Sequence, residues 1–510
     1  MTGESKHKHA PAIPVWLDLV LVVVLPAALY LSTLAPTLTW AHNGQDGGDL
    51  IAAVFTSGVP HPPGYPTYVL LGKLFALLPV GEPAYRLNLM SAVCAVLTTG
   101  LVYLMVRNWL AGSGSPDWLA RLSALGAGWA LALSPLLWSQ AVIAEVYALN
   151  ALLVALCLYL LRRWRGAARQ ARLVGKGGAS LGWLLGLFLV VGLALGNHLT
   201  IALLAAPILV YLAVSQEVAT GTHGPGIRVQ QYWPLALALA AGLSVYLYLP
   251  WAARHDPPVN WGDPSTLERF AWVVSGGPYR AYVLALPWAQ VPARLSATAH
   301  SLLAQFGPWG VALGFVGLTI LWRRDRSFGL VTASGALLYV IYATGYDTAD
   351  SYVYLIPAFL LFAVWIGVGA HAVLVGLQDR WAPLVGLAGT AWLAIILAGA
   401  WANWDILDLS HDRAARDWAA ATLAEAPERG LVITGQDGHT FGLWYFQHVE
   451  GIRPDVVVVD RDLLGYAWYR QYLRVHHPEL NVESVRVRSL IADNPGRPTV
   501  HLSGLAAAAP

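Results

Sequence analysis

The sequence predicts an α-helical protein that spans a membrane many times and carries a small α/β domain at its C-terminal end. Hydrophobic residues make up 57% of the 510 residues and charged residues only 12%, about half of the roughly 25% found in soluble domains. Long apolar runs recur up to Trp404, and the sequence after it has the pattern of a soluble protein. This composition excludes an ordinary cytosolic enzyme, a coiled coil and a disordered chain.

About eleven runs are long and apolar enough to be transmembrane helices, because a helix rises about 1.5 Å per residue across a hydrocarbon core of about 30 Å. They cover approximately residues 15–35, 87–107, 120–138, 141–161, 181–197, 199–214, 233–250, 302–322, 328–345, 353–375 and 382–401. The first is too long for the apolar part of a cleaved signal peptide, and no small-residue cleavage site stands out after it. We therefore expect it to remain as a span.

Lys and Arg gather in one set of connections, and such connections stay cytoplasmic. If eleven spans alternate, these side chains fall on one side of the membrane: Lys6, Lys8, Arg107, Arg121, Arg162, Arg163, Arg165, Arg169, Arg172, Lys176, Arg323, Arg324, Arg326 and Arg380. The N-terminus is then predicted to be cytoplasmic, with domain 1–403 in the membrane and domain 404–510 on the outer face.

Three connections on the outer side are rich in Pro, Gly, aromatic and acidic residues. We call them the first (37–86), second (251–301) and third (346–352) connections. Residues 65–80 of the first are apolar but too few to span, which predicts an interfacial or re-entrant helix. Beyond Trp404, a run rich in Ala, Glu and Arg precedes two β-type runs, 431–434 and 455–459, which predict a small α/β domain.

Two carboxylates open the first connection, in the run Gln45-Asp46-Gly47-Gly48-Asp49. Carboxylates three positions apart can share one face of a helical turn, and the glycines allow a ligand to approach the backbone closely. Partial burial would raise the pKa of one of them, as a general base requires. The alternative is an Asx turn or a helix cap.

Other polar side chains lie at the outer ends of spans. The run Gly58-Val59-Pro60-His61-Pro62-Pro63-Gly64-Tyr65-Pro66 holds one histidine and one tyrosine on a rigid backbone, although an ordinary turn is the alternative. Glu145 and Tyr147 open the fourth span, and Asn197 and His198 lie between the fifth and sixth. A carboxylate or imidazole near membrane depth usually faces a protein-lined cavity. A satisfied interfacial histidine is the alternative for His198.

The second connection carries arginines that suit a lipid phosphate, because guanidinium binds phosphate oxygens bidentately. These are Arg254, Arg269 and Arg280, and the alternative for each is an interfacial anchor. Asn260, Trp261 and Asp263 lie among them. The third connection adds Asp347 and Asp350, for which a solvated turn is the alternative.

Several classes of chemistry lack support in the sequence. The two cysteines, Cys94 and Cys157, lie in apolar runs, so there is neither a disulfide framework nor metal-ligand spacing, and we expect no metal. No Walker A loop, HExxH motif or nucleophile elbow is present. A net charge of +2 gives no electrostatic support for a nucleic-acid partner.

Six motifs together point to a known family: DGGDLIAA from Asp46, VPHPPGYP from Val59, AEVYALN from Ala144, GNHLT from Gly196, LPWAARHDPPVNWGDPSTLERF from Leu249 and YDTADSYVYLIPAF from Tyr346. Weaker matches, LWYFQHVEGIRPDVVVVD from Leu443 and WYRQYL from Trp468, extend into the C-terminal part. With these motifs the chain resembles GT-C type polytopic membrane glycosyltransferases. More closely, it is similar to the bacterial branch of a family that includes a eukaryotic transmembrane protein O-mannosyltransferase.

The resemblance implies a GT-C fold, a bacterial plasma-membrane location and an inverting transfer on the outer face from a polyprenyl-phosphate-linked sugar. Mannose is the leading candidate for the sugar, and no cofactor is expected beyond this lipid-linked donor. The acceptor, a Ser or Thr of a protein, a glycan or a lipid, stays open. In the family pattern an Asp is followed by a small residue, Gly and Glu. Asp46 matches the Asp, and Asp49 stands in the Glu position.

Roles for the candidate residues follow from this resemblance. Asp46 is expected to act as the base, with Asp49 as the second catalytic candidate. Arg280, Arg254 or His198 would meet the leaving phosphate. His61 and Tyr65 would order the loop beside Asp46, while Glu145 and Tyr147 would help to line the cavity. The outer domain is expected to recognise the acceptor.

Two other functional classes remain as alternatives. A transporter or flippase of lipid-linked sugars would share the many spans, but transporters place ionisable residues near the midplane of the membrane, often in repeated halves. Here the acids gather on one side and no convincing repeat is found. A noncatalytic scaffold would not explain the acids in three separate connections.

Overall fold

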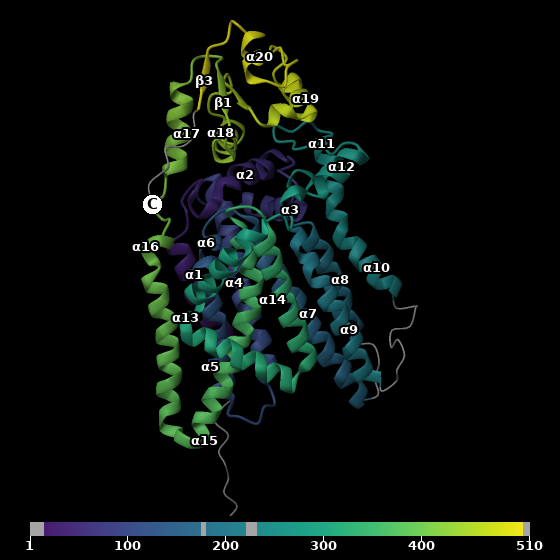
Figure 1. Ribbon diagram of the computed structural model, residues 1–510, viewed down its shortest axis with the longest axis vertical. Coiled ribbons are helices and arrows are strands. Elements are labelled where there is room, and N and C mark those ends of the chain that lie inside the picture. Colours follow the sequence, from purple (N-terminus) through teal and green to yellow (C-terminus); the bar gives the residue numbers. More distant parts are fainter. Residues whose placement is uncertain (1–14, 175–179, 221–231, 503–510) are drawn as a thin grey trace, which may run out of the picture.

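The structure is a computed structural model that describes residues 15–174, 180–220 and 232–502. Lys6, Lys8 and Lys176, which supported the predicted orientation, lie outside the described residues. Within the described part, six helices are long and apolar enough to cross a membrane, or seven if a bent pair counts as one span. The architecture is therefore the predicted helical membrane protein, and Figure 1 shows most helices running along its long axis.

The helices of the membrane part follow the predicted runs. They are α1 (Val15–Ser32), α4 (Pro83–Leu110), α5 (Asp117–Ala132), α6 (Pro135–Ala141), α7 (Val146–Val174), α8 (Leu181–Leu195), η2 (Leu199–Leu204), α9 (Ala205–Thr220), α10 (Tyr232–Leu243), η4 (Ser244–Leu247), α11 (Tyr248–Ala253), α13 (Val291–Arg324), α14 (Arg326–Gly345), η7 (Ser351–Leu355) and α15 (Ile356–Ala402). The predicted number of eleven spans stays a prediction, because several of these helices are short, bent or joined.

Breaks in the helices account for part of the difference between eleven predicted runs and six or seven long helices, and the runs predicted at 15–35, 181–197 and 199–214 fall on apolar helical segments of only 10–17 residues. The run predicted at 120–138 is divided into α5 and α6, which meet at an angle of 64° where Pro135 begins α6. The two runs predicted at 353–375 and 382–401 form the single element α15, with a break at Trp381 (φ −143°, ψ 53°). Figure 1 shows α15 running to one end of the molecule and returning toward α16 (Trp404–Leu407), so it contains two antiparallel arms.

The three connections gather at one end of the helices (Figure 1). The first contains η1 (Ala41–Asp46), α2 (Gly47–Thr56) and α3 (Pro66–Ala76), and the second contains α12 (Leu267–Val274), η5 (Gly277–Tyr282) and η6 (Trp288–Gln290). Val59 and Asn260 form a parallel β-bridge between the first and second connections. The amide of Asp347 donates to the carbonyl of Tyr282 at 3.0 Å and joins the third to the second.

The predicted short helix in the first connection is present as α3, whose 11 residues are too few to span a membrane. Basic side chains gather at the other end of the bundle. There Arg162 and Arg165 of α7 both pair with Asp325, which caps α14, and Arg121 pairs with Asp18. Which end faces the cytoplasm stays a prediction.

The C-terminal module, residues 404–502, is a small α/β unit. It contains α17 (Ala414–Glu425), β1 (Leu431–Thr434), α18 (Asp437–His448), β2 (Val457–Asp460), η8 (Leu463–Gly465), α19 (Ala467–His476), α20 (Val487–Ala492) and β3 (Thr499–His501). The strands form a parallel sheet in the order β2-β1-β3. The sequence predicted β1 and β2 from their buried apolar runs but not β3, which has three residues and is partly exposed.

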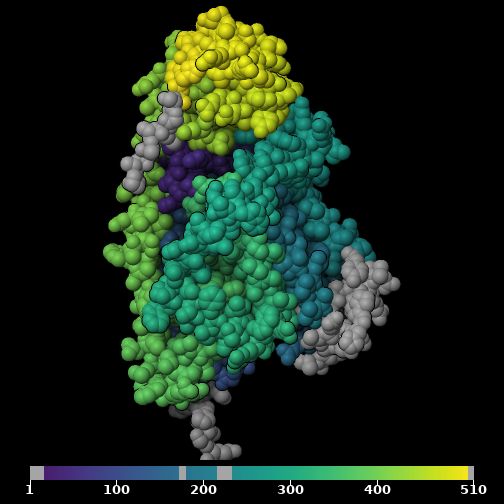
Figure 2. Space-filling model, in the orientation of Figure 1, coloured from purple at the N-terminus to yellow at the C-terminus, as the bar shows by residue number. Residues whose placement is uncertain are grey.

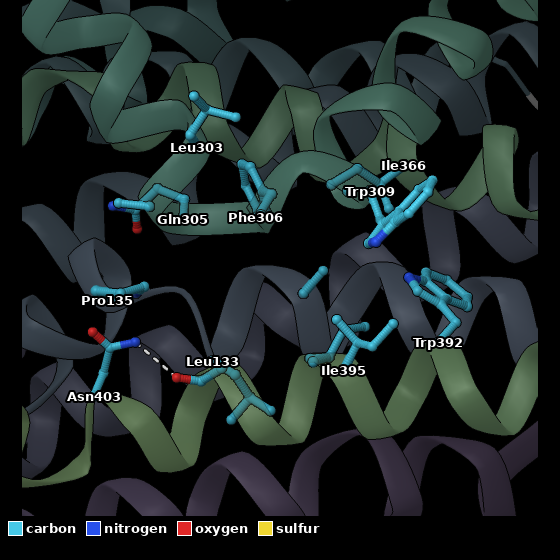
Figure 3. A pocket seen from close by; sticks show the side chains of 16 residues that line it. Leu133, Pro135, Leu303, Gln305, Phe306, Trp309, Ile366, Trp392, Ile395 and Asn403 are labelled. Atoms are coloured by element: carbon cyan, nitrogen blue, oxygen red, sulfur yellow. Dashed lines mark hydrogen bonds between the residues drawn. The ribbon is translucent and has the colours of Figure 1, made fainter.

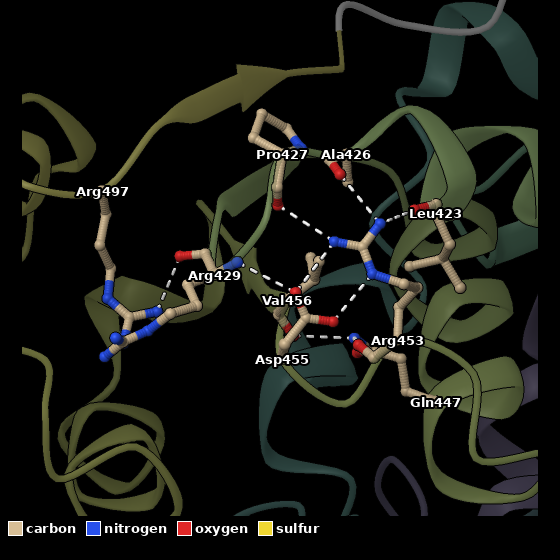
Figure 4. A network of polar contacts seen from close by, with 9 residues as sticks. All are labelled: Leu423, Ala426, Pro427, Arg429, Gln447, Arg453, Asp455, Val456 and Arg497. Atoms are coloured by element: carbon tan, nitrogen blue, oxygen red, sulfur yellow. Dashed lines mark hydrogen bonds and ion pairs between the residues drawn. The ribbon is translucent and has the colours of Figure 1, made fainter.

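Arg453 fastens the turns at one edge of this module (Figure 4). Its guanidinium donates to the carbonyls of Leu423, Ala426 and Pro427, at 2.7, 2.9 and 3.2 Å, and pairs with Asp455 at 2.8 Å. The network joins the end of α17 to the turn before β2. It also provides hydrogen-bond donors for carbonyl groups at the C-terminal end of α17, where a helix cannot supply them itself. It stabilises the module far from the polar residues that the sequence singled out.

The module covers the end at which the connections gather, and Figure 2 shows it in yellow, with purple residues of the N-terminal part beneath it. The helix α18 packs directly on α2. A Cβ on Gly48 would lie 2.4 Å from the carbonyl oxygen of Phe441, so only glycine permits this approach. The indole of Trp40 donates to the carbonyl of Gly438 at 3.1 Å. The module is thus held against the first connection by close backbone contacts.

Candidate active site

The two aspartates of the first connection have different environments. Asp46 ends η1 and is the N-cap of α2, and its side chain is 39% exposed. Asp49 lies in the first turn of α2 and is completely buried, with 0% exposure. Both positions suit carboxylates, because the N-terminus of a helix favours negative charge. Only Asp46 is open to a ligand.

Asp49 is fully engaged by protein donors. It accepts hydrogen bonds from the backbone amide of His61 at 2.8 Å and from the indole of Trp261 at 3.0 Å, and its Oδ2 lies 2.8 Å from Nδ1 of His61. These contacts bring the first and second connections onto α2. Asp49 therefore orients His61 and Trp261, and it has no free face for a substrate.

His61 faces Asp46 with its other ring nitrogen. Its Nε2 lies 3.1 Å from the hydroxyl of Tyr65 and 3.6 Å from Oδ2 of Asp46. Burial lowers the pKa of His61, but the carboxylates of Asp46 and Asp49 outweigh that effect and raise the pKa to about 9. His61 is therefore a cation at neutral pH, held between two carboxylates.

Asp46 has the properties of a proton acceptor. Burial raises its pKa above the usual 3.8, the charge of His61 opposes that rise, and Asp49 and Asp350 add to it. Nearby, burial and the charge of Asp46 raise the pKa of Glu145 well above its usual value. This shift favours the uncharged form of Glu145, one of whose oxygens has no hydrogen-bond partner among the described residues.

Asp46 opens into a cavity of about 540 Å³. Residues from the first, second and third connections, from α7 and η7 and from the C-terminal module line it: Asn43, Gln45, Asp46, His61, Tyr65, Tyr147, Tyr279, Tyr282, Tyr346, Thr348, Ala349, Asp350, Tyr352, Tyr354 and Asp437. Asn43 donates to the hydroxyl of Tyr352 at 2.8 Å and closes one wall. Carboxylates beside aromatic faces can bind the hydroxyls and the ring of a sugar.

A smaller chamber of about 100 Å³ adjoins this cavity, and the two share Tyr65, Tyr279, Tyr346 and Tyr354 as walls. Arg280 of η5 and His198 line the smaller chamber. Nδ1 of His198 accepts a hydrogen bond from the amide of Thr200, so the proton of the neutral ring is on Nε2. Burial and the cationic His61 lower the pKa of His198 to about 4, so it is a neutral donor and Arg280 supplies the positive charge.

Several residues singled out from the sequence do not line either space. Arg269 pairs with Asp263 and also donates to Gln471 in the C-terminal module, at 3.4 Å. Arg254 and Asp347 are exposed. The amides of Asn197 and Asn260 donate to the carbonyls of Val146 and Ala253, at 3.2 and 3.5 Å. The indole of Trp261 donates a hydrogen bond to Asp49 and does not face either space. Among these residues, Arg269 links the second connection to the C-terminal module and Trp261 links it to the first.

The cavity also contains residues that the sequence did not single out. Asp437 comes from the C-terminal module, at the junction of β1 and α18. Its position after a parallel strand and at the start of a helix is where ligands of α/β sheets often bind, so this signal was available. The tyrosines Tyr282 and Tyr354 come from η5 and η7 and were not distinguishable from ordinary interfacial aromatics.

A separate apolar cavity of about 180 Å³ lies at the break in α13, where Gly307 has φ +63°. Figure 3 shows the indoles of Trp309 and Trp392 at one end of it, with Gln305 and Asn403 at the other. None of its lining residues is titratable, so it offers no acid–base chemistry. Within the described chain, no group of three or more His, Cys, Asp or Glu side chains is placed to hold a metal ion.

Comparisons with known proteins point to one family. The model of the family "Protein O-mannosyl-transferase TMEM260 N-terminal domain" matches residues 46–222, and "TMEM260-associated domain 2" matches residues 415–486. Protein O-mannosyl-transferase TMEM260 of Mus musculus is 28% identical over 482 residues, which are 89% of this chain and 63% of that protein. The protein of the same name in Dictyostelium discoideum is 23% identical over 495 residues, 89% of this chain and 58% of its own. The chain thus spans about 60% of the length of these relatives.

Two solved structures share the fold. ArnT from Cupriavidus metallidurans bound to undecaprenyl phosphate has a TM-score of 0.56 at 14% identity, covering 90% of this chain and 92% of its own. The Archaeoglobus fulgidus oligosaccharyltransferase has a TM-score of 0.55 at 13% identity, covering 91% of this chain and 68% of its own. The GT-C fold expected from the sequence motifs is confirmed.

Proposed function

Because this chain is a GT-C type membrane protein similar to the TMEM260 protein O-mannosyltransferases, we propose that it is an inverting glycosyltransferase. It moves a sugar, with mannose as the first candidate, from a polyprenyl-phosphate donor to a Ser or Thr hydroxyl of a protein on the outer face. The names of the relatives support the sugar and the protein acceptor. The undecaprenyl phosphate bound by the ArnT neighbour supports the lipid carrier.

The reaction is a single displacement in the cavity of Asp46. The carboxylate of Asp46 accepts the proton of the acceptor hydroxyl. At the same time the oxygen of that hydroxyl forms a bond to the anomeric carbon of the sugar. The bond from that carbon to the phosphate oxygen breaks on the opposite face, and polyprenyl phosphate leaves with the electron pair. Attack and departure on opposite faces invert the configuration of the sugar, and both substrates must be aligned for this.

In this proposal the leaving phosphate binds in the smaller chamber. Arg280 supplies a permanent positive charge there, and Nε2 of the neutral His198 donates a hydrogen bond. Preorganised donors of this kind stabilise charge that develops on the leaving group. In this proposal the sugar lies between the smaller chamber and Asp46, along the tyrosines that line both spaces.

His61 and Asp49 control the environment of Asp46, the proposed base. The imidazolium of His61 lies 3.6 Å from Asp46, limits the rise in the pKa of that carboxyl and so favours its ionised form. Asp49 holds the ring in place and keeps it protonated. The observation that carries the proposal is this arrangement: an accessible carboxylate with a raised pKa, beside a chamber that offers Arg280 to an anion.

A transfer assay tests the proposal. Purified protein is incubated with radiolabelled polyprenyl-phosphate-mannose, or with other polyprenyl-linked sugars, and with a peptide that carries Ser or Thr. We expect label in the peptide, attached with inverted configuration. Movement of the donor across proteoliposome membranes, with no transfer or donor hydrolysis, would replace the transferase by the flippase alternative.

A further inference from the structure

Asp437 is the one residue of the C-terminal module, within the described chain, that lines the cavity of Asp46. It begins α18, and the residues that follow it in this helix are fixed by contacts with the first connection. The next residue, Gly438, accepts the hydrogen bond of Trp40, and one turn later Phe441 stacks on His61 with ring centroids 6.3 Å apart and planes 9° apart. The module therefore holds this carboxylate at a defined place in the cavity wall.

The carboxylate of Asp437 has no protein partner in the part of the chain that the structure describes. Asp460, at the end of the neighbouring strand β2, shows the contrast. It accepts hydrogen bonds from Thr440 and from the amides of Asp462 and Leu463, at 2.7 to 3.0 Å. Asp460 is thus used for structure, whereas Asp437 is accessible from the cavity. An ionised group without a partner in a wet cavity is available to a ligand.

The cavity is acidic on this side. Asp46, Asp350 and Asp437 all line it, and His61 is the only cation among its described lining residues. Partial burial and the charge of Asp46 raise the pKa of Asp437 to about 6, which still leaves it ionised at neutral pH. Arg280, by contrast, lies in the adjoining chamber. Positive and negative ends of the substrate site are therefore separated.

Because the positive chamber and the acidic side are separate, the donor and the acceptor can be assigned to different parts of the site. The phosphate of the donor requires the positive chamber, and a like-charged phosphate would be repelled by Asp437 and Asp350. The acidic side is built in part by the module, which covers the end of the molecule away from the helices (Figure 1), where a polypeptide would enter from solvent. The acidic side is therefore the side of the acceptor.

We propose that Asp437, together with Asp350, forms a subsite that selects acceptor polypeptides carrying a Lys or Arg next to the modified hydroxyl. This inference rests on the proposed function and specifies its acceptor. A charged hydrogen bond from an ammonium or guanidinium group to a carboxylate is strong, and charge complementarity at an interface gives specificity. In this subsite Asp437 binds substrate, and the proton of the hydroxyl still goes to Asp46.

Paired peptides test the subsite. Two peptides identical except for Lys or Glu beside one Thr are compared by kcat/KM at constant ionic strength. The wild type is expected to prefer the Lys peptide by about tenfold or more, since one charged hydrogen bond contributes roughly 1.5 kcal/mol or more. Asp437→Asn should reduce the preference to within about threefold, while Asp437→Glu should restore it.

Asp462→Asn is the matched control, because that carboxyl lies in the same module, is exposed and pairs only weakly with Arg461, at 3.3 Å. It should leave the preference unchanged. Equal transfer to the Lys and Glu peptides by the wild type would overturn the subsite and leave the transferase intact. A preference that survives in Asp437→Asn would overturn the role of Asp437. Absence of transfer and donor hydrolysis with every donor and peptide would instead refute the proposed function.

Discussion

Asp46 and Asp49 are the same residue type three positions apart, yet the fold gives them different tasks. The sequence indicated that two carboxylates share this turn, and their roles depend on residues far along the chain. Trp261, 212 positions from Asp49, donates to its Oδ1 and closes it to ligands. A contact of this separation leaves no signal in the local pattern. The local pattern could thus find the pair, and only the family resemblance favoured Asp46 as the base.

The indole of Trp261 provides a test of the buried carboxylate. Trp261→Phe keeps the aromatic packing and removes one of the donors to Asp49, which leaves a buried charge less well satisfied. We expect a loss of about 1–3 kcal/mol in stability, measured by unfolding in detergent. Trp468→Phe is the matched control, because Trp468 packs on Trp261 and its indole nitrogen has no partner among the described residues. Equal losses in the two variants would show that the hydrogen bond to Asp49 is unimportant.

The protonation of His61 makes stability depend on pH. Its pKa is raised from 6.5 to about 9 in the folded protein, so proton binding favours folding. The contribution is complete below pH 6.5 and is lost as pH rises through 9. We therefore expect the unfolding temperature of the wild type to exceed that of His61→Gln by more at pH 6.5 than at pH 9.5. A difference that stays constant or widens with pH would contradict the charged state of His61.

At the scale of elements, close approaches of backbone decide the architecture of the site. Gly48 allows α18 to lie on α2, and the contact brings Phe441 onto His61 and Asp437 into the cavity. The sequence predicted the helices and the strands β1 and β2 from their apolar patterns. It did not predict which helix of the module meets α2, because a glycine that permits a close contact looks the same as a glycine in a turn.

Gly48→Ala tests this contact. The new Cβ would lie 2.4 Å from the carbonyl oxygen of Phe441, so the module must shift away from the cavity. We expect at least a tenfold loss of transfer, although alanine is the better helix former by about 1 kcal/mol. Gly465→Ala, where a Cβ meets nothing within 4 Å, should have little effect on transfer. Full transfer activity in Gly48→Ala would show that the module need not touch α2.

At the scale of the whole molecule, the chain divides its polar chemistry between two ends. The three connections and the C-terminal module gather at one end, and the arginines of α7 pair with Asp325 at the other. The apolar runs and the concentration of basic residues predicted this division. The number of spans stays a prediction, because the α5–α6 pair is bent and the two arms of α15 are joined at a backbone break.

The predicted orientation can be measured with single cysteines, since Cys94 and Cys157 are both buried. Glu483, in the C-terminal module, is exposed, and so is Ser113, near the opposite end. A membrane-impermeant maleimide should label Glu483→Cys in intact cells and should label Ser113→Cys only after permeabilisation. The reverse pattern would invert the topology and place the cavity on the cytoplasmic side.

We propose that Asp46 removes the proton of the acceptor hydroxyl during transfer. The most direct measurement is single-turnover transfer from a radiolabelled polyprenyl-phosphate sugar by purified wild type, Asp46→Asn and the control Asp347→Asn, whose exposed carboxyl lies outside the cavity lining. We predict a loss of about 10²-fold or more for Asp46→Asn, with unchanged unfolding temperature and donor binding, and nearly normal transfer by Asp347→Asn. Wild-type turnover in a folded Asp46→Asn variant would show that Asp46 is not the base.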